Sequence, residues 1–222
     1  YELDGELAER VREVLLDYRY WMDMEGADAM CFWSENHALM FYASAMDAGS
    51  FYPEDYFTRA GMKGRELALF GKRKVLEWLE DVENGGFEEF LSTVYMCVTL
   101  AALLNVVDFA EADISSRARA LTDRLVQELC RQTFRGSVIA PMGRVYREVI
   151  YPFDQGAQSI IHLLDPKAPD VYGEGWLAFL ANSTYRFPDG LTELMEKEAE
   201  GTYASGNALT ALENHRDYCL TS

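Results

Sequence analysis

The chain has 222 residues, 49% of them hydrophobic, which is enough to bury a sizeable core and excludes a disordered chain. Its formal net charge is −17, from 37 acidic and 20 basic residues, and this excess argues against a nucleic-acid partner bound through phosphates. It argues equally against an anionic membrane surface, so we expect neither partner.

No linker, repeat or low-complexity run divides the chain, so the sequence predicts one helical domain over residues 1–222. The last residues, 214–222, read like the start of a further ordered segment, which indicates a fragment of a longer protein. The N-terminus shows no signal peptide, and the apolar stretch 94–110 is too short and too polar to span a bilayer. We expect a soluble protein and leave its location and oligomeric state open.

Apolar residues recur at helical spacing along most of the chain. Long helices are predicted at residues 6–21, 34–47, 64–82, 92–110 and from 113 to a stop at Gly136. Residues 137–150 read as extended or as a loop. Shorter helices are predicted at about residues 155–164, 175–182 and 191–201.

The predicted helices alternate between two kinds. Helices 6–21, 64–82 and the one from 113 are amphipathic, whereas helix 92–110 is apolar almost all round. Such alternation suggests an outer layer of helices wrapped on an inner one. The predicted fold class is therefore all-α, with the layers of a complete or incomplete (α/α) toroid or barrel and a small irregular or β segment.

Ser34 is followed by Glu35, Asn36 and His37 at the predicted start of the second helix. Backbone N–H groups and the helix dipole create a positive field there, which favours an ionised Glu35 and a neutral His37. A neutral imidazole can abstract a proton, so His37 is a candidate catalytic residue. The alternative is structural: Glu35 and Asn36 serve the helix end, and His37 packs beneath Trp33.

Aromatic side chains flank this motif. Trp33, Phe41 and Tyr42 suit a wall on which a sugar ring could stack. Aromatic residues at helical spacing more often form a core, and the sequence leaves both interpretations open. Trp33 and Tyr42 are accordingly candidate substrate-binding residues.

A second candidate group is Arg144 and Tyr146, which follow Pro141 and Met142 in an irregular segment. If this segment is extended, both side chains project to one face, because side chains alternate along a strand. An arginine beside a tyrosine could bind and protonate an anionic or hydroxylated ligand. The alternative is a surface arginine that pairs with Glu148.

A third group leads into the apolar helix. Glu88 and Glu89 precede Ser92 and Tyr95, and all four could lie at the same rim as His37 if both helices start at the same end. Alternatively, Ser92 caps the helix and the two glutamates complement its positive end.

The sequence contains no recognisable metal or cofactor site. Its three histidines are scattered without a metal-ligand spacing, so we expect no metal. The phosphate-binding glycine motifs and the hydrolase G-x-S-x-G motif are missing from the sequence, so we expect no cofactor.

Asn36-His37 and the Arg144/Tyr146 pair, set among alternating helices, resemble the (α/α) toroid enzymes that act on polysaccharides, including alginate-lyase-like and heparinase-like proteins. The segments Trp33 to His37, 86–89, 92–95 and 143–146 also resemble a largely uncharacterised bacterial family of longer proteins with a Trp-Ser-Glu-Asn-His motif. That second resemblance implies no activity.

The lyase resemblance implies β-elimination on a uronate-containing oligo- or polysaccharide. This reaction requires one group to neutralise the carboxylate, one to take the proton and one to protonate the leaving oxygen. The resemblance implies that Asn36 and Arg144 neutralise, that His37 or Tyr146 is the base, and that Tyr146 or Tyr95 is the acid.

Two other functions remain open. A glycoside hydrolase of the toroid class would pair Glu35 with Glu88, Glu89 or Asp154. A non-catalytic helical binding or scaffold domain would use the Glu-Asn-His motif only as a helix cap.

Overall fold

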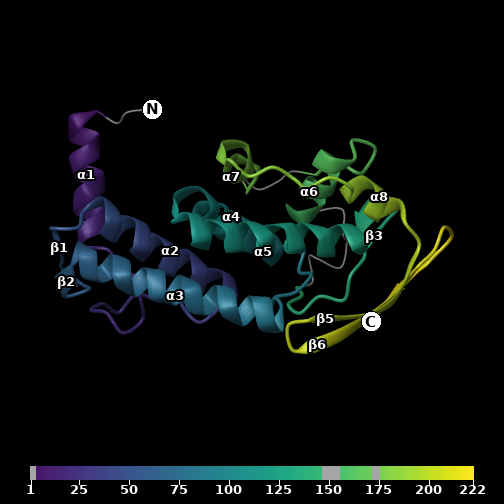
Figure 1. The fold of residues 1–222 in the computed structure, drawn as a ribbon, viewed down its shortest axis with the longest axis horizontal. Coiled ribbons are helices and arrows are strands. Elements are labelled where there is room, and N and C mark those ends of the chain that lie inside the picture. The colour runs from purple at the N-terminus through teal and green to yellow at the C-terminus, as the bar shows by residue number, and fades with distance from the viewer. Residues whose placement is uncertain (1–3, 147–155, 172–175) are drawn as a thin grey trace. The chain divides into compact units, whose positions relative to one another are not determined.

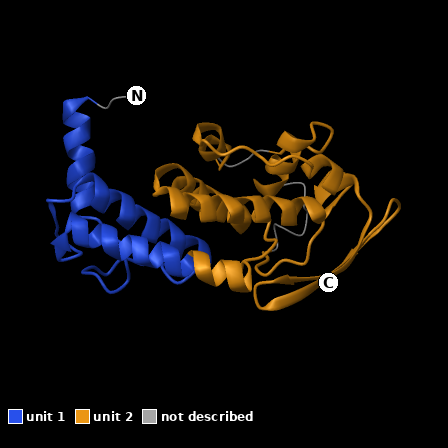
Figure 2. Ribbon diagram, in the orientation of Figure 1, with its two compact units in different colours: residues 1–78 blue, residues 79–222 orange. Residues whose placement is uncertain are grey.

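The fold combines helices with small antiparallel sheets (Figure 1). A computed structural model describes residues 4–146, 156–171 and 176–222. These residues form eight helices and seven strands, about 52% helix and 12% strand, and the strands pair into three sheets. The predicted all-α toroid is therefore wrong, and the fold class is mixed α and β. The chain divides into two compact units, residues 1–78 and 79–222 (Figure 2).

Unit 1 contains two helices, one small hairpin and the start of a third helix. Its elements are α1 (Gly5–Leu16), α2 (Glu35–Phe51), β1 (Tyr56–Phe57), β2 (Met62–Lys63) and α3 (Gly64–Gly85), which continues into unit 2. None of the described residues of α1 is buried, so its predicted apolar stripe stays at the surface. The helix ends at Leu16 and not at Trp21, because the following aromatic residues leave it to enter the core of unit 1. Tyr20 is fully buried there, and its hydroxyl donates to the Leu15 carbonyl at 2.9 Å.

Helix α2 runs past the predicted stop at Gly49. A Cβ atom on Gly49 would lie 2.4 Å from the Gly64 carbonyl oxygen, and one on Gly71 would lie 2.4 Å from the Met46 nitrogen. These distances are too short for any real side-chain carbon. The glycines therefore serve the close packing of α2 against α3, and they do not end a helix. Gly86, with φ +82°, ends α3 as predicted.

Unit 2 begins with the end of α3 and continues with α4 (Tyr95–Phe109) and α5 (Ala112–Arg131). Helix α4 is buried almost all round, as its composition predicts, and packs against α5, α6 and α7. The predicted apolar stripe of α5 is also buried. The remaining elements are β3 (Thr133–Phe134), β4 (Ser137–Val138), α6 (Gly156–Leu164), α7 (Trp176–Asn182), α8 (Leu191–Glu196), β5 (Ala199–Ser205), β6 (Ala208–Asn214) and β7 (Cys219–Thr221).

The sheets of unit 2 account for most of the departures from the predicted helices. Gly136, expected to end α5, instead follows Arg135 in a two-residue turn between β3 and β4, with φ values of +80° and +50°. The predicted helix 191–201 ends at Glu196, and the chain then forms the three-stranded sheet β5-β6-β7. Side-chain burial alternates along β5 and β6, the pattern of strands with one covered face. Gly206, with φ +56°, makes their two-residue turn.

Within the described ranges, none of the helices combines the length and the apolar character needed to cross a membrane.

Candidate functional site

Arg144 and Tyr146 form a hydrogen-bonded pair in unit 2, on the irregular segment after β4. Nε of Arg144 donates to the Tyr146 hydroxyl oxygen at 3.0 Å, and Nη2 donates to the same oxygen at 2.7 Å. The segment is held because the Gly143 amide donates to the Phe90 carbonyl at 2.9 Å. A Cβ atom on Gly143 would lie 2.8 Å from the Glu88 carbonyl oxygen, so this approach requires a glycine.

Two more residues of unit 2 join this pair, and we call Glu89, Tyr95, Arg144 and Tyr146 the Arg144 cluster. Nη1 of Arg144 donates to Glu89 Oε1 at 2.7 Å, and its guanidinium carbon lies 4.0 Å from the centre of the Tyr95 ring. The hydroxyl oxygens of Tyr95 and Tyr146 are 2.8 Å apart. Glu89 is 8% exposed and Tyr146 44% exposed, so the cluster connects a buried carboxylate to a phenol that solvent reaches.

The surroundings of Tyr95 and Tyr146 shift the pKa values of the two phenols in opposite directions. Bonds from Tyr95 and Arg144 lower the pKa of Tyr146 below its ordinary value of 10. Burial and the bond with Tyr146 raise the pKa of Tyr95 to about 12. An ionised Tyr146 oxygen can accept all three neighbouring donors, two N–H groups of Arg144 and the Tyr95 hydroxyl. The cluster therefore makes Tyr146 the more acidic of the two phenols and Tyr95 the less acidic one.

Arg144 also has capacity for a ligand. A guanidinium group carries five N–H donors, and the bonds to Glu89 and Tyr146 use three of them. Within the described part of the chain, the other two have no partner. The Arg144 side chain is 39% exposed, and the bond with Glu89 raises its pKa, so it presents a permanent positive charge to solvent.

The Ser34, Asn36 and His37 group lies in unit 1, at the start of α2. Ser34 occupies the predicted N-cap position, although within the described residues its hydroxyl caps no backbone N–H group. This hydroxyl lies 2.9 Å from Asn36 Oδ1 and 2.6 Å from His37 Nδ1. Because an amide oxygen only accepts, a proton donated to Asn36 leaves the Ser34 oxygen to accept from Nδ1 of His37. That tautomer places the imidazole lone pair on Nε2.

The aromatic candidates of unit 1 separate into core and surface. Tyr42 is 9% exposed, with its ring centre 4.5 Å from that of Trp21. Phe41 is equally buried and packs on Phe32, with ring centres 4.3 Å apart. Trp33 is 76% exposed. Of the three predicted stacking residues, Phe41 and Tyr42 thus belong to the core, and Trp33 is the one at the surface.

The carboxylate pairs of the hydrolase alternative gain no geometric support. Glu35 belongs to unit 1, whereas Glu88 and Glu89 belong to unit 2. Glu88 is exposed and Glu89 is engaged by Arg144. Asp154 lies outside the described residues.

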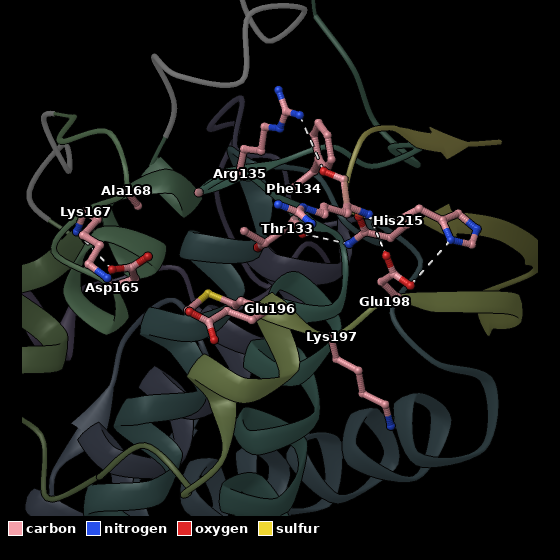
Figure 3. Close-up of a pocket in the computed structure, with 14 residues that line it drawn as sticks. Thr133, Phe134, Arg135, Asp165, Lys167, Ala168, Glu196, Lys197, Glu198 and His215 are labelled. Atoms are coloured by element: carbon pink, nitrogen blue, oxygen red, sulfur yellow. Dashed lines mark hydrogen bonds and ion pairs between the residues drawn. The ribbon is translucent and has the colours of Figure 1, made fainter.

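A pocket of about 510 Å³ lies in unit 2 (Figure 3), and none of the predicted site residues lines it. The β3-β4 turn, the segment after α6, the end of α8 and the end of β6 line it. Glu198 lies at one side of the pocket. Its Oε1 accepts from the Arg216 amide at 2.9 Å, and its Oε2 lies 4.0 Å from His215 Nδ1. In Figure 3 the side chains of Arg135 and Lys197 extend in opposite directions, so these two basic groups do not converge on one ligand position.

Family models, curated proteins and solved structures gave no match to the chain. These comparisons therefore neither support nor refute the resemblance to toroid lyases. In the described part of the chain, no group of three or more His, Cys, Asp or Glu side chains is placed to hold a metal ion.

Two features of the site were missed at the level of sequence. The sequence suggests Glu89 as a rim residue, as a complement to the positive end of the apolar helix or as a hydrolase carboxylate, yet in the structure it binds and positions Arg144. Asn214 and His215 repeat the Asn-His pair of α2, without the aromatic flank or the apolar helix. Asn214 is buried, and its Nδ2 donates to the Thr133 carbonyl at 2.9 Å, which fixes β6 against β3 beside the pocket. A single buried amide leaves no periodic signal in the sequence.

Proposed function

We propose that the Arg144 cluster is an acid and base site that cleaves a uronate-containing glycan by β-elimination. Tyr146 is the base, Tyr95 the acid, and Arg144 binds the uronate carboxylate. The observation that carries the proposal is the direct bond between the two hydroxyls, at 2.8 Å, within reach of one guanidinium group. The proposal rests on these side chains and not on a toroid fold. It assigns no step to Asn36 or His37, which belong to the other unit.

The reaction moves two protons: Tyr146 takes one from the substrate, and Tyr95 gives one to the leaving oxygen. The ionised Tyr146 takes the C5 proton of the uronate, and the electron pair of the C5–H bond becomes the second bond between C4 and C5. The glycosidic oxygen leaves C4 with the electron pair of the C4–O bond and takes a proton from Tyr95. The products are a new chain end and an unsaturated uronate. The Tyr95 and Tyr146 hydroxyls are in contact, so the proton taken by Tyr146 can restore Tyr95.

Arg144 contributes to this step in two ways. Its two remaining N–H groups can pair with the uronate carboxylate, which lowers the cost of charge developing at C5. Its bonds to the Tyr146 oxygen favour the ionised phenol. Glu89 fixes the guanidinium group from the buried side. The exposure of Arg144 and Tyr146 suits an extended polymer, which needs access to an open surface.

The test is release of unsaturated uronate, followed by its ultraviolet absorbance, from alginate, pectate, hyaluronan and heparin. We expect wild type to act on at least one of these polymers. Tyr146→Phe and Tyr95→Phe should each lower kcat/KM by about 100-fold or more, the usual contribution of a positioned acid or base. Tyr218→Phe is the matched control, because Tyr218 is 46% exposed and lies outside the cluster.

Two results would refute the proposal. One is wild type that releases no unsaturated product from any of the four polymers. The other is an active wild type whose activity survives Tyr146→Phe as well as it survives Tyr218→Phe.

A further inference from the structure

Strand β5 is one edge of the three-stranded sheet of unit 2, whose order is β5-β6-β7 (Figure 1). The other edge, β7, has three residues, and such a short edge offers little to an incoming strand. β5 has seven residues, which pair with β6 in a continuous register without a bulge. It contains neither proline nor lysine, the residues that commonly protect an edge. β5 is therefore the edge that is open to strand addition.

The hydrogen-bond pattern of the sheet shows which backbone groups of β5 face away from β6. Ser205 and Ala208 flank a two-residue turn, so they form a hydrogen-bonded pair, and such pairs recur at every second residue. The other side of β6 agrees with this pattern. The amides of Ala211 and Ser222 each donate to the carbonyl of the other residue, at 2.8 and 3.1 Å, so the backbone of Ala211 faces β7. The residue of β5 opposite Ala211, and every second residue from it, therefore points its backbone groups to the open edge.

Three residues of β5, Glu200, Thr202 and Ala204, have their N–H and C=O groups at this edge. Within the described ranges, no backbone or side-chain group forms a hydrogen bond with these amides or carbonyls. All three residues are exposed, and a space of about 260 Å³ lies beside this part of the strand, lined on one side by Thr202, Tyr203 and Ala204. An extended peptide can use these donors and acceptors as β6 uses those on the other side of β5.

The charge at this edge favours one kind of partner. Glu200 lies directly opposite Glu213 on β6, and both residues are on the exposed face of the sheet. In the described part of the chain, neither carboxylate forms an ion pair. Like charges directly opposite each other destabilise a sheet, and a lysine or arginine beside Glu200 on an added strand would relieve this repulsion. The net charge of −17 also favours a basic partner and disfavours pairing of β5 with a second copy of the chain.

We propose that the open edge of β5 binds an extended basic segment of a partner protein, which adds to the sheet as a fourth strand. Backbone hydrogen bonds to Glu200, Thr202 and Ala204 provide the affinity. Lysine or arginine side chains on the exposed face provide the preference for a basic sequence. The proposal does not depend on catalysis by the Arg144 cluster, and it is tested by binding alone.

The experiment measures binding of a fluorescein-labelled peptide, Ser-Lys-Val-Lys-Val-Lys-Ser, to the whole chain by fluorescence anisotropy. We expect this lysine peptide to bind, and the same peptide with glutamate in place of lysine not to bind. Two further versions of the lysine peptide carry backbone N-methyl groups, each at a different alternate set of residues. Because a strand bonds its neighbour through every second residue, one version should lose binding and the other should keep it.

Two variants of the chain test the position of the peptide. Thr202→Pro removes an amide that points away from β6, so the hairpin keeps its own bonds, and we expect the affinity to fall roughly tenfold. Thr221→Pro is the matched control on β7, because its amide also points away from β6. Glu200→Lys places a lysine opposite Glu213, which should leave the fold intact. It should lower the affinity for the lysine peptide and raise that for the glutamate peptide.

Four outcomes would overturn the proposal. The lysine peptide does not bind; both N-methylated versions bind as tightly as the parent peptide; or Thr202→Pro and Glu200→Lys both bind the lysine peptide as tightly as wild type. The fourth is a wild-type dimer in size-exclusion chromatography that Thr202→Pro converts to a monomer, because a second copy would then occupy the edge.

Discussion

Asp47→Asn tests whether burial of a carboxylate lowers the free energy of unfolding, because Asp47 is a half-buried carboxylate on α2. Burial raises its pKa from the ordinary 3.8 to about 6. In the described part of the chain no ion pair compensates for this burial. The folded protein therefore holds a proton that the unfolded chain releases between about pH 4 and 6, so the contribution of Asp47 to the free energy of unfolding falls as pH rises across this window.

The size of the effect follows from the same values. The difference between 3.8 and about 6 corresponds to about 3 kcal/mol at about 1.4 kcal/mol per pKa unit. Solvent that reaches a half-buried carboxylate reduces this, and we expect Asp47→Asn to raise the free energy of unfolding by about 1–2 kcal/mol above pH 6. Below pH 4 the two proteins should differ little, because Asp47 is then protonated in both states.

The measurement is urea unfolding of wild type and Asp47→Asn at a series of pH values from 3.5 to about 8. The contributions of other titrating groups cancel when the free energies of unfolding of the two proteins are subtracted. Asp81→Asn is the matched control, since it makes the same substitution at an exposed position on α3. A flat difference for Asp47→Asn, or one that falls as pH rises, would refute the reasoning.

The other predictions concern a helix contact, a turn and the acid and base pair. Gly71→Ala should lower the free energy of unfolding by about 2 kcal/mol, because its methyl group would overlap the backbone of α2; Gly85→Ala, on the same helix with open space around it, should be neutral or stabilising in the same denaturant assay. Arg135→Asn should raise the melting temperature, with a gain of about 0.5–1 kcal/mol, because asparagine tolerates φ +50° and asparagine-glycine favours this hairpin turn; a lower melting temperature would contradict this. Arg144→Gln should shift the rise of kcat/KM with pH to higher pH, because Tyr146 ionises less readily without the guanidinium group; an unshifted profile would exclude the proposed stabilisation of the phenolate.

The sequence predicted the long helices well and the hairpins poorly, for physical reasons. Helix α5 carries an apolar stripe at every helical turn, and that repeated signal predicted its start and its buried face, although not its end at Arg131. Strands β3 and β4 have two residues each, too few to show any alternation, and their turn uses Arg135 in a conformation that arginine rarely adopts. Residues 197–201 contain lysine, glutamate and alanine, which favour helix locally, and their pairing with β6 overrides that preference.

The candidate site was predictable only within short stretches of chain. The spacing of Arg144 and Tyr146 predicted that their side chains share a face, and the structure joins them by hydrogen bonds. The recruitment of Glu89 and Tyr95 could not be predicted, because it depends on how the loop before α4 passes the segment after β4. Contacts between residues far apart in sequence require the tertiary fold.

The burial of α4 has a consequence for how the protein can be made. Eleven of its fifteen residues are buried, and the helices of unit 2 that pack against it, α5, α6 and α7, all follow it in the chain. During synthesis, an apolar segment therefore leaves the ribosome long before its cover is complete. Chains that stop before the end of α7 are expected to aggregate, because an uncovered apolar helix associates with other copies. Expression of shortened versions should therefore keep residues 95–182 together.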